Sequence, residues 1–193
     1  MSLTPEQTDL HNRLYEDAWK LGKEEIQLDG RVLSKPGFFA RRRLHKCQRL
    51  IQQVLEIHPA NWSAMFLLGK IEQRFGNENE ALKWFLKARE FEPVNTSLAK
   101  EASLTASRLG DQSLAVRIVD EAIAVNPKDA ALRVNSGLAH LLAGQPGKAA
   151  ERFKEAVELE PTSTNEKLEL YAKRVVAGVL PLPRTEADII AEV

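Results

Sequence analysis

The chain has 193 residues and a balanced formal charge, because 27 lysines and arginines stand against 27 aspartates and glutamates. This balance argues against the net positive charge that is typical of nucleic-acid-binding proteins. The single cysteine excludes an intrachain disulfide, and no apolar run approaches the roughly 18 residues that span a bilayer. The sequence therefore favours a protein of the reducing cytoplasm, without a membrane span.

The first predicted element is a helix that begins after Thr4. Thr4 supplies a capping hydroxyl group, and Pro5 suits the first helical position because it needs no N–H partner there. We expect this helix to run to about Leu28 and to end at Asp29–Gly30. Residues 31–37 read as a connector because they are rich in Ser, Pro and Gly.

A second helix is predicted over residues 38–57, and Pro59 closes it. Cys47 stands one repeat interval before Ala81, a position at which small residues recur later in the chain. This favours a buried structural thiol over a nucleophile. The helix also carries a basic run, formed by Arg41, Arg42, Arg43, Lys46 and Arg49. This run is compatible with contact to nucleic acid or acidic lipid. A solvated helix face is favoured, because no aromatic residues for base stacking are interleaved with it.

From Pro59 onward, prolines, small residues and bulky residues each recur at the same interval, which is the spacing from Pro59 to Pro93 (93 − 59 = 34 residues). A constant interval of this length indicates a repeat architecture. Prolines that would end a helix recur at Pro59, Pro93, Pro127 and Pro161. Small residues recur at Ala81, Ala115 and Ala149, at Ala88, Ala122 and Ala156, and at Gly69, Ser103 and Gly137; bulky residues recur at Phe85, Val119 and Phe153. Helix starts are predicted at Asn61, Asn95, Asp129 and Ser163, and left-handed helix ends at Gly76, Gly110 and Gly144.

This pattern resembles the tetratricopeptide repeat, whose antiparallel helix pairs span about 34 residues and close on a proline. Three full copies would cover residues 62–95, 96–129 and 130–163. Met65, Ala99 and Arg133 replace the family's usual tryptophan in the first helix, and Glu72, Ala106 and His140 replace its tyrosine. The resemblance implies an all-α fold, a right-handed α-solenoid of antiparallel helix pairs with a C-terminal capping helix.

The last part of the chain departs from the repeat. Residues 164–179 predict a helix with one apolar stripe, which would cap the exposed end of the solenoid. Pro181 and Pro183 then forbid helix locally, and the last nine residues either are disordered or dock by Ile189 and Ile190. The expected organisation is an N-terminal helix pair over 1–60 (an atypical first repeat or a cap), three repeats over 61–163, a capping helix over 164–179 and a proline-containing tail over 180–193.

The sequence offers little for catalysis, which needs several groups that converge on one point. The four histidines, His11, His45, His58 and His140, show no metal-ligand spacing with one another or with Cys47. No glycine-rich phosphate loop is present, because Gly144–Gly147 reads as a turn between helices. We therefore expect a non-enzymatic protein with no metal site and no cofactor.

In the family that the chain resembles, the first helix of each pair, helix A, lines a concave groove that holds a peptide or a partner helix. The repeat register places these residues in the groove: Phe66, Lys70, Arg74, Lys100, Leu104, Arg108, Asn135, Leu138 and Leu142. The groove would be basic in its first half and apolar in its second. A partner segment with an acidic end and an apolar anchor would complement it.

Two other functions stay open at this point. The chain would serve either as an accessory or regulatory subunit of an enzyme or secretion machine, or as a self-associating solenoid. Some members of the family clamp the C-terminal carboxylate of a chaperone, and Lys100 and Asn135 fall at plausible positions for this clamp. However, Leu104 and Glu169 stand where polar and basic side chains are needed. A chaperone-binding role is therefore not favoured.

Overall fold

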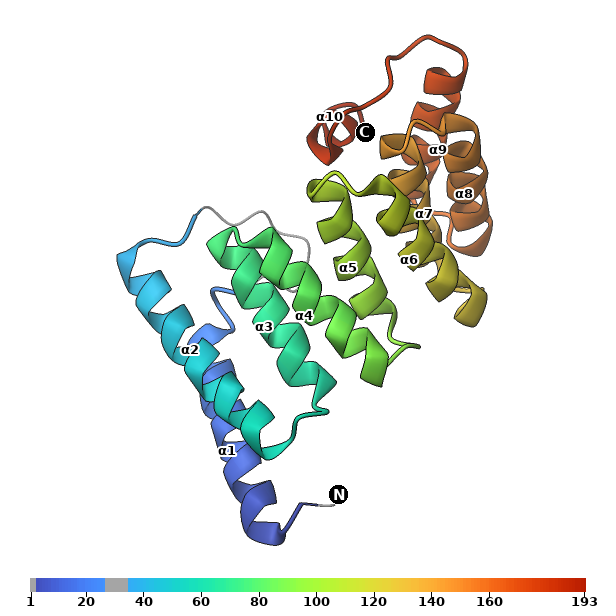
Figure 1. Ribbon diagram of the computed structural model, residues 1–193. Coiled ribbons are helices and arrows are strands. Elements are labelled where there is room, and N and C mark those ends of the chain that lie inside the picture. The colour runs from blue at the N-terminus through green and yellow to red at the C-terminus, as the bar shows by residue number, and fades with distance from the viewer. Residues whose placement is uncertain (1–2, 27–34) are drawn as a thin grey trace. The chain divides into compact units, whose positions relative to one another are not determined.

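The computed structural model describes residues 3–26 and 35–193, and all regular secondary structure in these two ranges is helical (Figure 1). The helices are α1 (Pro5–Gly22), α2 (Phe38–Ile57), α3 (Trp62–Phe75), α4 (Glu78–Phe91), α5 (Thr96–Arg108), α6 (Gln112–Val125), α7 (Ala130–Leu142), α8 (Pro146–Leu159), α9 (Ser163–Val176) and α10 (Glu186–Ile190). Successive helices pack as antiparallel pairs. The predicted all-α fold of stacked helix pairs is therefore confirmed.

The chain divides into two compact units, Met1–Pro93 and Val94–Val193. In the first unit α1 packs against α2, α2 against α3, and α3 against α4. The core of this unit includes the fully buried Ala18, Leu44, Cys47, Ile51 and Leu68. Gly22 lets α1 come close to α2, because an added Cβ would lie 2.9 Å from the Sγ atom of Cys47.

The first helix ends at Gly22, earlier than the predicted end near Leu28. The amides of Glu25 and Ile26 both donate to the carbonyl of Gly22 at 2.9 Å, and Ile26 turns into the core with 3% of its surface exposed. Glycine is a poor helix former, so burial of Ile26 overrides the helical pattern at this point. The predicted helix end and most of the predicted connector fall within residues 27–34, outside the described ranges.

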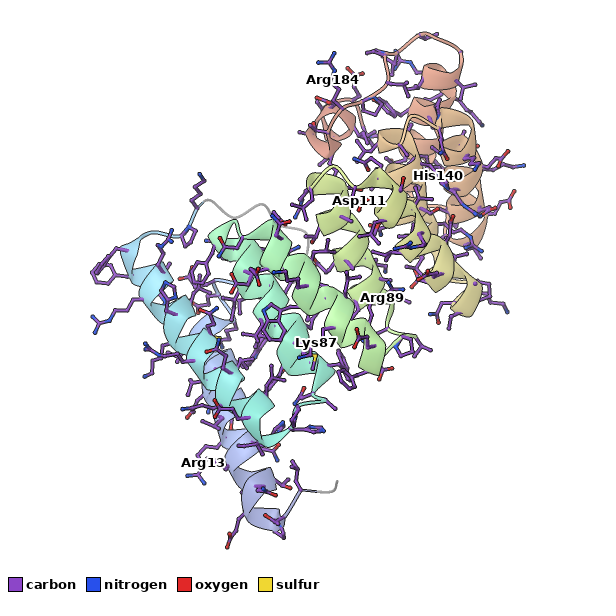
Figure 2. All side chains as sticks on the ribbon, in the orientation of Figure 1. Arg13, Lys87, Arg89, Asp111, His140 and Arg184 are labelled. Carbon is purple, nitrogen blue, oxygen red and sulfur yellow. The ribbon has the colours of Figure 1, made fainter. Side chains whose placement is uncertain are left out.

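The helices α3, α5 and α7 begin and end in the way that the sequence predicts. The cap predicted at Ser163 is wrong by one residue, because the Thr162 side chain accepts the amide of Asn165 at 3.2 Å and α9 begins at Ser163. The side chains of Asn61, Asn95 and Asp129 accept the amide of the residue three positions later at 2.9, 3.2 and 2.9 Å, and Asp111 caps α6 at 3.0 Å (Figure 2). The end positions Gly76, Gly110, Gly144 and Gly178 have φ values of 83°, 83°, 72° and 70°. Glycine adopts this left-handed conformation without steric cost. Gly178 shows that α9 ends with the same turn as the A helices before it.

In the second unit α5 to α9 pack in succession, and α9 lies against α8. The buried face of α9 differs from that of α7. Leu168 and Ala172, which stand one repeat period after Val134 and Leu138, are buried, whereas Leu170 is 59% exposed. The face of α9 that corresponds to the predicted groove is therefore covered, and the segment that follows α9 covers it.

Candidate partner-binding surface

The predicted groove residues of the first unit lie along α3. Phe66 is half-buried, and its ring centroid is 5.7 Å from that of Phe85 on α4. Lys70 is buried, with 7% of its surface exposed. Arg74 donates from Nε to the carbonyl of Glu25 at 2.9 Å, and its guanidinium lies 3.8 Å from the Glu25 carboxylate. Arg74 therefore ties α3 to the chain that follows α1.

Glu25 also forms an ion pair with Arg43 of α2, so one carboxylate joins three parts of the first unit. The side chain of Glu25 is 12% exposed, and that of Arg74 is 11% exposed. Sequence reasoning missed Glu25, because nothing in the local pattern connects it to an arginine 49 positions away. Its partners follow only from the turn at Gly22.

The predicted groove residues on α5 are already engaged by acids of the second unit. The Lys100 ammonium lies 3.6 Å from the carboxylate of Asp129, and the Arg108 guanidinium lies 3.7 Å from that of Glu186 on α10. Leu104 lies between them on the helix and is half-buried. The basic character expected on α5 is thus partly balanced by nearby carboxylates.

On α7 the predicted residues form a mainly apolar surface. Asn135 donates from its side chain to the carbonyl of Ala131 at 2.7 Å. Leu138 and Leu142 are partly buried and pack against a cluster that contains Leu141, Phe153, Leu168, Tyr171, Val175 and Ile189. Since Ile189 belongs to α10, the C-terminal segment (residues 180–193) shares this surface.

The C-terminal segment docks on the second unit. Ile189 is 1% exposed, whereas Ile190 is 72% exposed, so the expected docking occurs through Ile189 and not through both isoleucines. Lys167 donates from Nζ to the carbonyl of Val193 at 2.7 Å. Docking of this segment is one of the two alternatives that the sequence left open, and the structure selects it.

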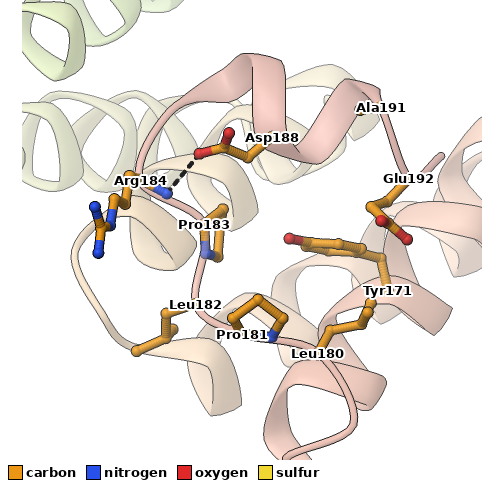
Figure 3. Close-up of a pocket in the computed structure, with 9 residues that line it drawn as sticks. All are labelled: Tyr171, Leu180, Pro181, Leu182, Pro183, Arg184, Asp188, Ala191 and Glu192. Atoms are coloured by element: carbon orange, nitrogen blue, oxygen red, sulfur yellow. Dashed lines mark hydrogen bonds between the residues drawn. The ribbon is translucent and has the colours of Figure 1, made fainter.

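A pocket of about 500 Å³ lies between the C-terminal segment and α9 (Figure 3). Its lining includes Tyr171, the extended stretch from Leu180 to Arg184, and Asp188. Asp188 accepts from the amides of Arg184 and Thr185 at 2.9 and 2.8 Å. Burial raises the pKa of the Tyr171 hydroxyl group, and the nearby carboxylates of Glu192 and Asp188 raise it further.

Comparison with known proteins decides the family. The family model described as "Tetratricopeptide repeat" matches residues 37–95 and 101–164, which is more than half of the chain. This chain belongs to the tetratricopeptide repeat family. The "BBSome complex member BBS4 homolog" of Drosophila melanogaster is 34% identical over 117 residues, which cover 49% of this chain and 24% of that protein. The present chain thus matches about a quarter of the length of this curated relative.

Solved structures agree with the fold of the tetratricopeptide repeat chain. A tetratricopeptide repeat protein from Parabacteroides merdae superposes with a TM-score of 0.72 and 17% identity, over 89% of this chain and 61% of that one. The first repeat domain of Spaghetti (RPAP3), bound to an HSP90 peptide, gives a TM-score of 0.56 and 19% identity, over 60% and 93% of the two chains. At these identities the likeness concerns the fold alone.

The buried titratable groups of this tetratricopeptide repeat protein have structural partners. Burial raises the pKa of the Cys47 thiol to about 12, and its Sγ donates to the carbonyl of Ala18 at 3.2 Å. His140 on α7 (Figure 2) is 3% exposed and shares a hydrogen bond of 2.9 Å with Gln145. Within residues 3–26 and 35–193, no His, Cys, Asp and Glu side chains gather into a group of three or more that would suit a metal ion. No helix in those ranges combines the length and apolarity needed to span a membrane.

Proposed function

We propose that this chain is a non-enzymatic scaffold that holds a short segment of a partner protein against its A helices. The observation that carries this proposal is the mixed surface on α5 and α7. There, the partly buried Leu104 lies on α5 with Lys100 and Arg108, and the partly buried Leu138 and Leu142 lie on α7, which contacts α5. Apolar side chains would supply contact area, and the cations would orient an acidic partner. Protein binding is also the general role of tetratricopeptide repeat domains.

The contacts of Arg108 and Lys100 support an acidic, partly apolar partner. Arg108 already accommodates the carboxylate of Glu186 at 3.7 Å, so this surface is compatible with an acidic side chain. Lys100 shares its charge with Asp129, and Asn135 uses its side-chain N–H on its own helix. Lys100 and Asn135 are therefore proposed as secondary contacts.

A separate contact surface is proposed on α3 of the first unit, formed by Phe66, Lys70 and Arg74. Phe66 would offer the exposed edge of its ring. Arg74 would act mainly by positioning, because its guanidinium holds Glu25. Lys70 is buried, with 7% of its surface exposed, so a partner on α3 would depend more on Phe66 than on Lys70 or Arg74.

The peptide complex of the RPAP3 domain supports a peptide-binding role but not the same peptide. In the present chain Glu169 forms an ion pair of 2.6 Å with Lys173, and Lys100 is paired with Asp129. A carboxylate clamp would need these positions to present free positive charge. We therefore propose a partner other than a chaperone tail.

Affinity capture with matched charge variants tests the proposal. The full chain is immobilised as wild type, as Arg108→Glu and as Lys154→Glu. Lys154 lies on α8, and its side chain is 66% exposed. Both variants change the charge equally, so a partner of the A helices is lost with Arg108→Glu and retained with Lys154→Glu. Retention by both variants would contradict the A-helix surface, and the absence of any specific partner would contradict the scaffold role.

A second candidate function, as a subunit of a stable multiprotein assembly, is favoured by the similarity to a BBSome complex member. Native mass spectrometry of the protein purified from its source distinguishes the two roles. A complex of fixed composition supports the subunit role. A monomer that forms a complex only after a partner protein is added to it supports the scaffold role. The reducing cytoplasm is the proposed compartment for both, because Cys47 is a buried free thiol.

A further inference from the structure

The C-terminal segment occupies part of the surface that the proposed function assigns to a partner. Glu186 meets Arg108 of α5, Ile189 enters the cluster against which Leu138 and Leu142 of α7 pack, and the Val193 carbonyl accepts from Lys167 of α9. Three helices of the second unit therefore hold one short stretch of chain. The contacts are an ion pair, an apolar anchor and a main-chain hydrogen bond, which are the contacts of a bound peptide.

This stretch is built differently from the helices of the repeats. By spacing, residues 180–193 correspond to α8, which lies one repeat period earlier as Pro146–Leu159. Pro181 and Pro183 prevent an equivalent helix, and α10 has five residues. Within α10, which is fully described, Ile189 alone is buried. The second helix of a repeat normally buries a whole face, so this segment makes much less contact than α8.

The short helix is also complete by itself. Thr185 and Asp188 form a reciprocal capping box, which satisfies the first amides of α10 without help from the rest of the protein. A pocket of about 500 Å³ opens beside Tyr171, and apart from Tyr171 its lining residues belong to the C-terminal segment itself. The segment is held by Ile189, by the buried Pro183 and by Leu180 and Val193 at the edge of the same cluster. None of these residues belongs to a helix of the repeats, so the segment can leave its site without breaking the pairing of α5 to α8.

We infer that the surface formed by Arg108, Leu138, Leu142 and α9 is a docking site for a short, capped helix of a partner protein. This helix carries an acid in its first turn and an apolar residue three positions later. Residues 183–193 occupy the site as a tethered ligand, which the partner must displace. This inference rests on the proposed function and names the chemistry of the partner.

The occupied state defines what the site recognises. Arg108 selects an acid at the position of Glu186, and the apolar cluster selects an apolar residue at the position of Ile189. Ile190, one residue later, is outside the contact. A tethered ligand has an effective concentration on the order of millimolar, so even a weak intramolecular contact lowers the apparent affinity for a free partner.

Peptide binding to full-length variants tests the inference. The probe is a fluorescent peptide with the sequence of residues 183–193, and the proteins are the wild type, Ile189→Asp and Ile190→Asp. Ile189→Asp releases the tethered segment, so this protein binds the probe at least tenfold more tightly than the wild type. Ile190→Asp is the matched control and behaves as the wild type. A probe that itself carries Ile189→Asp does not bind. Equal affinity of all three proteins, or no binding by Ile189→Asp, overturns the inference.

Three further measurements keep the test decisive if Ile189→Asp folds poorly. Hydrogen exchange on the wild type with excess unlabelled peptide should accelerate at the amides of α10 and leave α7 unchanged; unchanged exchange at α10 with bound peptide overturns the inference.

Arg108→Glu should weaken binding of the probe, and a probe with Glu186→Arg should restore binding. Light scattering that finds a wild-type dimer and an Ile189→Asp monomer overturns it in favour of a second copy as the occupant. If the peptide does not bind to any of the proteins, but affinity capture still finds a partner that is lost with Arg108→Glu, only this inference fails and the proposed function stands.

Discussion

A Cβ atom added to Gly137 would lie 2.5 Å from the Cε1 atom of Phe153, so the backbone of α7 and the ring on α8 are in direct contact. Gly69 on α3 and Phe85 on α4 make the same contact in the first full repeat. Both phenylalanines are fully buried. The glycine therefore sets how closely the two helices of a repeat approach each other.

The first prediction is that Gly137→Ala destabilises the second unit, although alanine is the better helix former. The methyl group would overlap a fully buried ring, and overpacking costs about 1–3 kcal/mol. Gly147→Ala on α8 is the control, because nothing lies within 4 Å of its added Cβ. This control should gain up to about 1 kcal/mol from helix propensity. Urea denaturation followed by circular dichroism measures both, and a Gly137→Ala protein as stable as wild type would contradict the packing described.

The second prediction concerns the middle repeat, where Ser103 and Val119 replace the glycine and the phenylalanine. Ser103 donates to the carbonyl of Ala115 at 3.0 Å, and Val119 is fully buried. Val119→Phe alone should cost about 1–3 kcal/mol, because the serine side chain occupies the space that the ring needs. Adding Ser103→Gly should recover most of this loss. A double-mutant cycle with no coupling beyond about 0.5 kcal/mol would show that the two positions are independent.

This regular packing explains why most of the fold was predictable. Gly137 and Phe153 belong to one repeat, and the same contact recurs when the register is kept. The repeat period therefore carries information about which side of each helix is buried. The helix caps at Asn95 and Asp129 follow for the same reason, since capping is a local interaction.

The candidate site was less predictable, because the acidic residues that pair with its arginines lie outside the repeats. Glu25 reaches Arg74 only after the chain turns at Gly22, and Glu186 reaches Arg108 only after it leaves α9. Ion pairs of this kind depend on backbone positions that no sequence period specifies. The glycine at position 178 was a usable signal, because it continues the spacing of the earlier helix ends.

The third prediction is that Glu25→Gln destabilises the first unit. The Glu25 side chain is 12% exposed and faces Arg43 and Arg74, so loss of its charge leaves two arginines without this counter-ion. We expect a loss of about 1–3 kcal/mol, which is common when a charged hydrogen-bonding partner is removed from a largely buried site.

Tryptophan fluorescence during urea denaturation reports this loss, because Trp19, Trp62 and Trp84 are the tryptophans of the chain and all belong to the first unit. Glu16→Gln is the control, since its ion pair with Lys20 is exposed on both sides. This control should leave the transition unchanged. An equal shift in the two variants would remove the special role assigned to Glu25.

The fourth prediction concerns pH and His140. Burial lowers the pKa of His140 below its ordinary value of 6.5, and the hydrogen bond that the imidazole donates to Gln145 and the charge of Asp120 oppose this shift only in part. The cationic Lys148 and Arg152 lower the pKa further. As the pH falls, the unfolded chain therefore binds a proton at this histidine before the folded chain does.

The contribution of His140 to stability is thus complete above pH 6.5 and declines as the pH falls below that value toward the folded-state pKa. His140→Gln should reduce the difference in the free energy of unfolding between pH 7.5 and pH 5.5, because the glutamine side chain does not titrate. Urea denaturation at both pH values provides the four free energies for this comparison. If His140→Gln keeps the full pH dependence of the wild type, other groups cause it and the burial of His140 has no measurable effect on acid stability.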